Sequence, residues 1–307
     1  MSIRVAFFGS SDFSVPILSA LNNYFLVSVV ITQPDRQKGR GKEVLFSPVK
    51  NQAKADGMLV FQPANLSKTA MKPVIENRNI ELIVVAAYGK ILPKWILDYP
   101  TYGCINVHAS LLPRWRGASP IQSVILSGER ETGVTIMLMD EGLDTGKIIN
   151  KKEIPVSADD TYESLGNRLS LLGAEILIDT LNEYISGNII PVSQDETEAT
   201  YCGLIKKEDG RLDFNLTAEE LERQVRAFYP WPGSFFEWNG NVLKVYDSEV
   251  SSTHSLNPFE RGIVNRYPVI GSSSYDLLLK KVQVPGKKVI TGAEFLNGMR
   301  GWLDNEN

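Results

Sequence analysis

The feature that most constrains the fold is an almost uninterrupted apolar run from Glu81 to Ala87, which reads E-L-I-V-V-A-A. A strand that is apolar on both faces is typical of the centre of a parallel sheet with helices on either side. Two more apolar segments, Ile3 to Phe8 and Leu26 to Thr32, precede it, and segments with helix signals lie between them. This alternation predicts an α/β fold with an N-terminal, doubly wound, mainly parallel sheet.

The stretch from Gly103 to Pro120 begins as a short apolar strand and breaks into a polar loop after His108. Side chains two apart on a strand share a face, so Asn106 and His108 are expected to point the same way. Ligands of open α/β sheets bind beyond the carboxyl ends of the strands. An amide donor and an imidazole there suit acyl transfer to an amine, which needs oxyanion stabilisation and proton handling. The pair alone more often marks a hydrogen-bonded loop start, so that alternative stays open.

A second polar segment runs from Met139 to Gly146 and follows an apolar, β-rich run. It carries three carboxylates and two glycines, so it is a loop that can bring one carboxylate against the imidazole. We expect this carboxylate to be Asp144, because Gly142 and Gly146 let the backbone turn tightly on either side of it.

These segments and four others resemble the formyltransferases that use 10-formyltetrahydrofolate. The shared motifs run in order along essentially the whole chain. They are F-F-G-S-S-D-F-S-V-P near the start, T-Q-P-D-R-Q-K-G-R-G-K at 32–42, N-x-H before S-L-L-P-R-W-R-G-A-S-P-I-Q at 110–122, M-D-E-G-L-D-T-G, R-A-F-Y-P-W-P-G at 226–233, and V-P-G-K-K…G-A-E-F-L.

The resemblance implies formyl transfer from 10-formyltetrahydrofolate to the α-amino group of methionyl initiator tRNA. It implies three sets of site residues: Asn106, His108 and Asp144 for catalysis; Ser110, Leu111, Leu112 and Pro113 for folate binding; and Arg36, Lys38, Arg40 and Lys42 of a long basic loop for tRNA binding. Arg114 and Arg116 fit either the acidic tail of the folate or RNA phosphate, and the sequence does not choose between them.

The length of 307 residues predicts two domains. We expect a catalytic domain with a Rossmann-like formyltransferase fold at 1–188, a linker at 189–205 and a smaller domain at 206–307. Thr217 to Phe228 is expected to be a helix with a capping box formed by Glu220. Short β-like runs separated by turns then predict a small barrel, which the resemblance makes an OB-like, tRNA-binding domain. Trp231, Phe235 and Phe236 are expected in its core.

Composition bears on nucleic-acid binding, metal binding, membrane insertion and cellular location. The net charge of −4 is weak evidence against a dedicated nucleic-acid binder, although basic residues cluster at 36–42 and 266–300. Two widely separated histidines and two isolated cysteines give no metal-ligand spacing, so no metal is expected. No apolar run reaches the roughly 18 residues of a membrane span. Few cysteines and no signal segment favour a cytoplasmic protein, for which we expect a monomer.

Three alternatives stay open. The nearest is another folate enzyme that would share the same catalytic residues: a formyltransferase acting on an amino-sugar nucleotide or purine precursor, or a formyl-folate hydrolase. The second is a non-catalytic tRNA-binding protein. The third is a nicotinamide-dependent oxidoreductase, which the missing G-x-G-x-x-G spacing after the first strand disfavours.

Overall fold

A computed structural model describes residues 3–38, 43–253, 255–298 and 301–303. Contacts between Cα atoms divide the chain into two compact units. The first unit comprises residues 1–120, 131–155 and 166–203, and the second comprises residues 121–130, 156–165 and 204–307. Each unit is described by itself.

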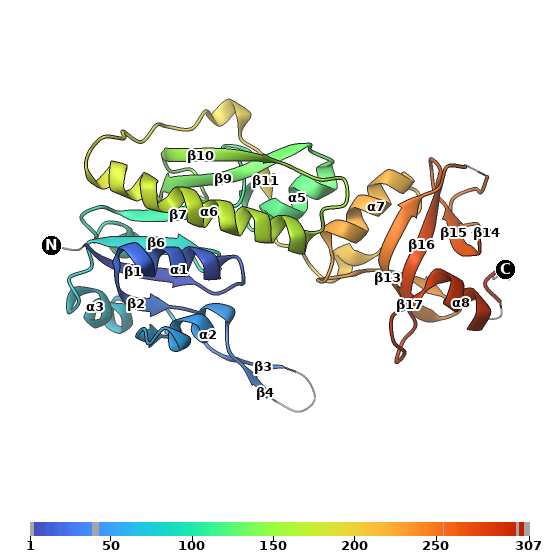
Figure 1. Ribbon diagram of the computed structural model, residues 1–307, viewed down its shortest axis with the longest axis horizontal. Coiled ribbons are helices and arrows are strands. Elements are labelled where there is room, and N and C mark those ends of the chain that lie inside the picture. The colour runs from blue at the N-terminus through green and yellow to red at the C-terminus, as the bar shows by residue number, and fades with distance from the viewer. Residues whose placement is uncertain (1–2, 39–42, 254, 299–300, 304–307) are drawn as a thin grey trace. The chain divides into compact units, whose positions relative to one another are not determined.

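Within the described residues, the first unit holds a seven-stranded sheet with the order β10-β9-β7-β6-β1-β2-β5 (Figure 1). Its strands are β1 (Arg4–Gly9), β2 (Leu26–Ile31), β5 (Val60–Phe61), β6 (Leu82–Ala86), β7 (Cys104–His108), β9 (Glu131–Leu138) and β10 (Ile148–Pro155). The strands from β7 to β5 pair in parallel, whereas β9 pairs antiparallel with both β7 and β10. The mainly parallel sheet is therefore confirmed, with an antiparallel edge.

The apolar run that defines the fold forms β6, and all five of its residues are buried. It lies between β1 and β7 in the sheet, as a strand without a polar face must. One face of the sheet packs against Met71, Val74 and Ile75 of α3 (Lys68–Glu76). The other is crossed by α6 (Tyr162–Ile185), where Gly173 lies so close to β7 that an added Cβ would meet Val107 Cγ1 at 2.9 Å (Figure 1).

Serine side chains cap two helices of residues 1–203. Ser47 accepts a hydrogen bond from Lys50 N and caps α2, which has Pro48 in its first turn. Ser67 caps α3 in the same way, and α3 continues through Pro73. The others in residues 1–203 are α1 (Ser14–Tyr24), α4 (Lys94–Leu97) and α5 (Pro120–Ser127), and α2 spans Pro48–Ala55.

The basic loop expected after β2 is an antiparallel hairpin, formed by β3 (Arg36–Lys38) and β4 (Glu43–Leu45). Arg36 and Lys38 lie on β3, while Arg40 and Lys42 fall outside the described residues. An ion pair between Asp35 and Lys50 lies at the base of the hairpin, where Gln62 also donates to Asp35 Oδ1 at 2.8 Å. Hydrogen bonds from these two side chains lower the pKa of the Asp35 carboxyl.

The segment expected to be a linker, residues 189–205, belongs to the first unit as far as Gly203. Val192 forms an antiparallel bridge with Ile148, and the short helix η1 (Glu196–Glu198) follows. Strand β11 (Tyr201–Cys202) then pairs in parallel with β8 (Arg116–Gly117). These pairings involve one or two residues each, so they produce no repeating apolar pattern in the sequence.

The second unit combines α7 (Ala218–Ala227) with an antiparallel sheet. The capping box between Thr217 and Glu220 is confirmed. Within the described residues the sheet order is β12-β13-β16-β15-β14, with β17 paired to β16, and its ends are not joined. The elements are β12 (Ser234–Trp238), β13 (Asn241–Val250), β14 (Arg261–Val264), β15 (Tyr267–Gly271), β16 (Asp276–Gln283), β17 (Ile290–Thr291) and α8 (Gly292–Gly298) (Figure 1).

The core of the second unit confirms one aromatic prediction and corrects another. Phe236 lies on the inner face of β12 and packs in the core with Trp238 and Phe295. Trp231, expected in the core, is 55% exposed. Trp231 lies in the turn between α7 and β12, which is closed by a hydrogen bond from Gly233 N to Phe228 O. In the described part of the chain, no helix is long and apolar enough to cross a membrane.

Candidate active site

Strand β7 delivers the first two candidate residues to the carboxyl end of the sheet. Asn106 and His108 are 9% and 6% exposed, and their backbone partners on the adjacent strand β9 are Met137 and Thr135. Both positions share one face of the strand, as their spacing predicts. Neighbouring strands on both sides of β7 rigidify this part of the backbone.

The loop between β9 and β10 delivers the third candidate, Asp144. Its backbone is left-handed, with φ of 54°, which is uncommon for a residue with a side chain. The neighbouring glycines leave room for close contacts that a side chain would block. An added Cβ on Gly146 would lie 1.8 Å from Leu138 O, and one on Gly142 would lie 1.9 Å from Thr145 Oγ1. The prediction that glycines permit this turn holds, but the left-handed residue is Asp144 itself.

The structure brings Asn106, His108 and Asp144 together. Asp144 Oδ2 lies 3.6 Å from His108 Nδ1, and Asp144 Oδ1 accepts a 3.4 Å hydrogen bond from Asn106 Nδ2. Gly117 N donates to Asp144 Oδ2 at 2.9 Å, and His108 Nε2 lies 3.0 Å from Trp115 O. The carboxylate is thus held by backbone and aimed at the imidazole, and Asp144 is only 14% exposed.

The segment expected to bind folate presents two of its four residues to the surface. Ser110 is fully buried, and its hydroxyl donates to Arg114 O at 2.7 Å. Leu112 is fully buried too, and its backbone N donates to Thr135 Oγ1 at 3.1 Å. Leu111 and Pro113 are half-buried, so they are the members of this set with surface available to a ligand.

Two apolar side chains in the loops that follow β6 and β9 are exposed to solvent. Ile91, after β6, is 87% exposed, and Leu143, next to Asp144, is 57% exposed. Lys94, the first residue of α4, forms an ion pair with Glu141 in the loop after β9. Apolar residues in this position can cover a flat, partly apolar ligand.

The two arginines that the sequence left unassigned have different surroundings. Arg114 is exposed, and its guanidinium lies 5.9 Å from the centre of the Trp115 ring. Arg116 is fully buried and forms a bidentate ion pair with Glu196, with both N–O distances at 2.8 Å. This pair raises the pKa of Arg116 and lowers that of Glu196. Arg116 is therefore directed inward, away from any external phosphate or folate carboxylate.

Sequence reasoning missed Gln194, Glu196 and Tyr201, which all contact the Arg116 guanidinium. They lie in the segment expected to be a linker, about eighty residues away along the chain. The acidic D-E-T-E run was the available signal, but an acidic run is usually a solvated surface.

Groups of three or more His, Cys, Asp or Glu side chains that could hold a metal ion are not found among the described residues. Both cysteines are buried, and burial raises the pKa of the Cys104 thiol, so it stays protonated and inert.

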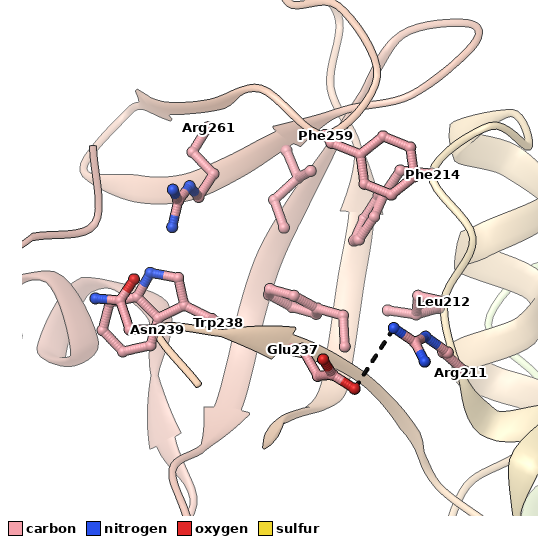
Figure 2. A pocket seen from close by; sticks show the side chains of 10 residues that line it. Arg211, Leu212, Phe214, Glu237, Trp238, Asn239, Phe259 and Arg261 are labelled. Atoms are coloured by element: carbon pink, nitrogen blue, oxygen red, sulfur yellow. Dashed lines mark ion pairs between the residues drawn. The ribbon is translucent and has the colours of Figure 1, made fainter. Parts of the chain in front are cut away.

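The second unit contains a cavity of about 240 Å³ with aromatic walls and charged residues at its rim (Figure 2). Phe214 packs edge-on against Phe236 and Phe259, with ring centroids 5.4 Å and 5.6 Å apart. Arg211 forms a 3.5 Å ion pair with Glu237 on one side. An aromatic cavity bordered by arginine side chains has the chemistry needed to hold an unstacked base.

Two family profiles and a full-length relative match this chain. Residues 3–181 match the profile of formyl transferases, and residues 204–300 match that of the formyl transferase C-terminal domain. The chain is 41% identical over 304 residues to methionyl-tRNA formyltransferase of Lachnospira eligens, covering 96% of each protein.

Solved structures share the fold at lower identity. An N-formyltransferase from Helicobacter canadensis, in complex with folinic acid and dTDP-3-aminofucose, aligns with a TM-score of 0.67 and 20% identity over 90% of this chain and 98% of that one. HypX from Aquifex aeolicus aligns with a TM-score of 0.65 and 16% identity over 96% of this chain, which spans 49% of the HypX chain. The two profile matches and the full-length relative show that this chain belongs to the formyl transferase family.

Proposed function

We propose that this protein transfers the formyl group of 10-formyltetrahydrofolate to the α-amino group of methionyl initiator tRNA, for translation initiation. The observation that carries the chemistry is the convergence of Asn106, His108 and Asp144 at the carboxyl end of β7. The acceptor rests on the full-length relative, at 41% identity over 96% of the chain.

The amine of the methionyl ester attacks the formyl carbon, and the formyl oxygen becomes negatively charged. Asn106 and a protonated His108 stabilise this oxyanion. His108 Nε2 lies against Trp115 O, so its donation requires the formyl oxygen to replace that carbonyl. Hydrogen bonds at catalytic groups commonly rearrange in this way when the substrate binds.

The proton must then move from the attacking nitrogen to the leaving nitrogen of the folate. Asp144 lies beside both other groups, and it accepts this proton directly or through a water and delivers it to the folate nitrogen. The bond between the formyl carbon and that nitrogen breaks, giving formylmethionyl-tRNA and tetrahydrofolate. Asp144 ends in its starting charge state, so the cycle balances without a metal.

We assign the folate to the surface formed by Leu111, Pro113 and the exposed side chains of Ile91 and Leu143. Ser110 and Leu112 support this surface from below, because their polar groups are bonded inside the protein. A pterin is flat and partly apolar, and the backbone of such loops supplies the hydrogen bonds that orient it.

We assign the acceptor stem to the hairpin that carries Arg36, Lys38, Arg40 and Lys42. Four cations in seven residues suit RNA phosphates, and they account for binding by a chain with net charge −4. The aromatic cavity of the second unit is our candidate for a contact with an unpaired base.

In this proposal residues 1–188 are the catalytic domain, residues 206–307 are a tRNA-binding domain, and residues 189–205 connect them. The protein acts in the cytoplasm as a monomer.

The test is to incubate the purified protein with 10-formyltetrahydrofolate and methionyl initiator tRNA, and to measure formylmethionine after deacylation. Elongator methionyl-tRNA and an amino-sugar nucleotide are the matched alternative acceptors. Formylation of the sugar but not of the tRNA would contradict the proposal, and free formate without acceptor would indicate a hydrolase. Tight tRNA binding without transfer would indicate the non-catalytic alternative.

The hairpin assignment is tested separately by replacing its four cations with Ala. Binding of tRNA should weaken and its dependence on salt should flatten, by up to about 0.9 of the log–log slope for each phosphate that is no longer neutralised. An unchanged salt slope would exclude the hairpin.

A further inference from the structure

Gln194 holds the loop that carries the catalytic carboxylate. It lies outside any helix or strand, and its Nε2 donates to the backbone oxygens of Asp144 and Gly146 at 2.8 Å and 2.7 Å. These two carbonyls lie on either side of Thr145, so a single amide group bridges the turn. A left-handed backbone such as that of Asp144 persists only where its surroundings hold it in place.

Arg116 in turn fixes Gln194. Its Nε and Nη2 donate to Gln194 Oε1 at 3.1 Å and 2.9 Å, and its Nη atoms donate to Glu196 at 2.8 Å each. Nη1 also donates to Tyr201 Oη at 3.2 Å. The guanidinium therefore uses all five of its N–H groups inside the protein. The Arg116 guanidinium can only donate, so the Gln194 oxygen must face it. The backbone carbonyls can only accept, so the Gln194 NH₂ group must face them.

The backbone at Arg116 holds the same carboxylate from a second direction. Gly117 N donates to Asp144 Oδ2 at 2.9 Å, and β8 is anchored by its pairing with β11. The Arg116 side chain thus acts on Asp144 through Gln194 and the loop backbone. The Gly117 N–H acts directly on the Asp144 carboxylate.

We propose that Gln194, oriented by Arg116, is a positioning residue that aims the Asp144 carboxylate at His108 and Asn106. In this role Gln194 acts through the loop that carries Asp144. The segment that follows α6 is then part of the catalytic apparatus. This inference rests on the proposed role of Asp144, and it assigns to Arg116 an internal task in place of substrate binding.

The test compares Gln194→Ala with a matched control, Gln224→Ala. Gln224 Nε2 also donates to two backbone oxygens two residues apart, those of Asp209 at 3.1 Å and Arg211 at 3.2 Å. The control therefore loses the same type of bonds elsewhere. Gln194→Ala should lower kcat about 10–100-fold, as loss of a supporting hydrogen bond or a small misplacement does. KM for both substrates should change less than roughly threefold. The control should keep kcat.

Gln194→Glu separates the bond to Arg116 from the bonds to the loop carbonyls of Asp144 and Gly146. A carboxylate keeps its pairing with Arg116, so the segment stays attached, but it has no N–H for the carbonyls of Asp144 and Gly146. This variant should lose kcat as Gln194→Ala does. Wild-type kcat in Gln194→Glu would overturn the inference, as would equal kcat losses in Gln194→Ala and in the control.

The imidazole NMR signals give a readout that does not depend on activity. The chain has two histidines, so the His108 signal is assigned by its absence in His108→Ala. It should move in both Gln194 variants, because the facing carboxylate moves, and stay in place in Gln224→Ala. An unmoved signal would contradict the positioning role. If the wild type forms no formylmethionine but the signal moves as expected, the proposed function fails and the positioning role stands.

Discussion

Replacing Asp144 with Asn tests the centre of the proposed chemistry with the smallest change in shape. The carboxylate accepts from Gly117 N on one oxygen and from Asn106 Nδ2 on the other. An amide has one oxygen, so in either orientation its NH₂ group faces a donor. The variant also lacks the charge beside His108 and cannot take up the proton that the amine loses.

The expected magnitude follows from these losses. A positioned proton-transfer group typically contributes about 10²–10⁴-fold to the rate, which corresponds to about 3–5 kcal/mol of barrier. The donor that faces the new NH₂ group costs about 1–3 kcal/mol of folding stability. We therefore expect kcat to fall by about 10²–10⁴ while KM for tRNA and folate changes little.

The assay is single-turnover formylation at saturating concentrations of both substrates, because it measures the chemical step rather than product release. Asp140→Asn is the matched control. Asp140 lies in the same loop, and its Oδ1 alone accepts from Gly142 N at 3.0 Å and Thr145 Oγ1 at 2.7 Å, which an Asn oxygen can also do. If Asp144→Asn kept more than about a tenth of wild-type turnover, or if both variants lost activity equally, the proton-transfer role would be wrong.

The Tyr88 hydroxyl is buried without a hydrogen-bond partner among the described residues, and burial raises the pKa of Tyr88 to about 12. Tyr88→Phe should therefore raise the free energy of unfolding by about 1 kcal/mol in urea titrations, and a loss of stability would contradict this. Arg116 lowers the pKa of Glu196 in the folded protein. The ion pair therefore stabilises the fold at pH values above the ordinary pKa of a Glu side chain, and this stabilisation is lost as the pH falls through the lowered pKa. Calorimetry of Glu196→Gln should thus show a smaller drop in thermal midpoint on acidification than the wild type, and parallel curves would refute it. Phe259→Ala should weaken tRNA binding by about 1–3 kcal/mol if the cavity stacks a base, whereas Trp231→Ala, another exposed aromatic outside that cavity, should not; equal effects would exclude the cavity.

Local pattern explains where sequence reasoning succeeded. The apolar run at β6 permits only a strand covered on both faces, and the period of two along β7 puts Asn106 and His108 on one face. The capping box of α7 joins residues three apart. Each of these features depends on neighbours in the chain, so the sequence alone predicted the mainly parallel sheet, the strand that carries Asn106 and His108, and the start of α7.

Only the tertiary structure decided which distant groups meet. The contact between Arg116 and Gln194 joins residues 78 apart, and the bond from Gln194 to Asp144 joins residues 50 apart. No periodicity encodes such pairs, because their geometry depends on how the segment after α6 packs against β8. Packing therefore turned an arginine that could have met a substrate inward, and it gave an apparent linker its place beside the carboxylate.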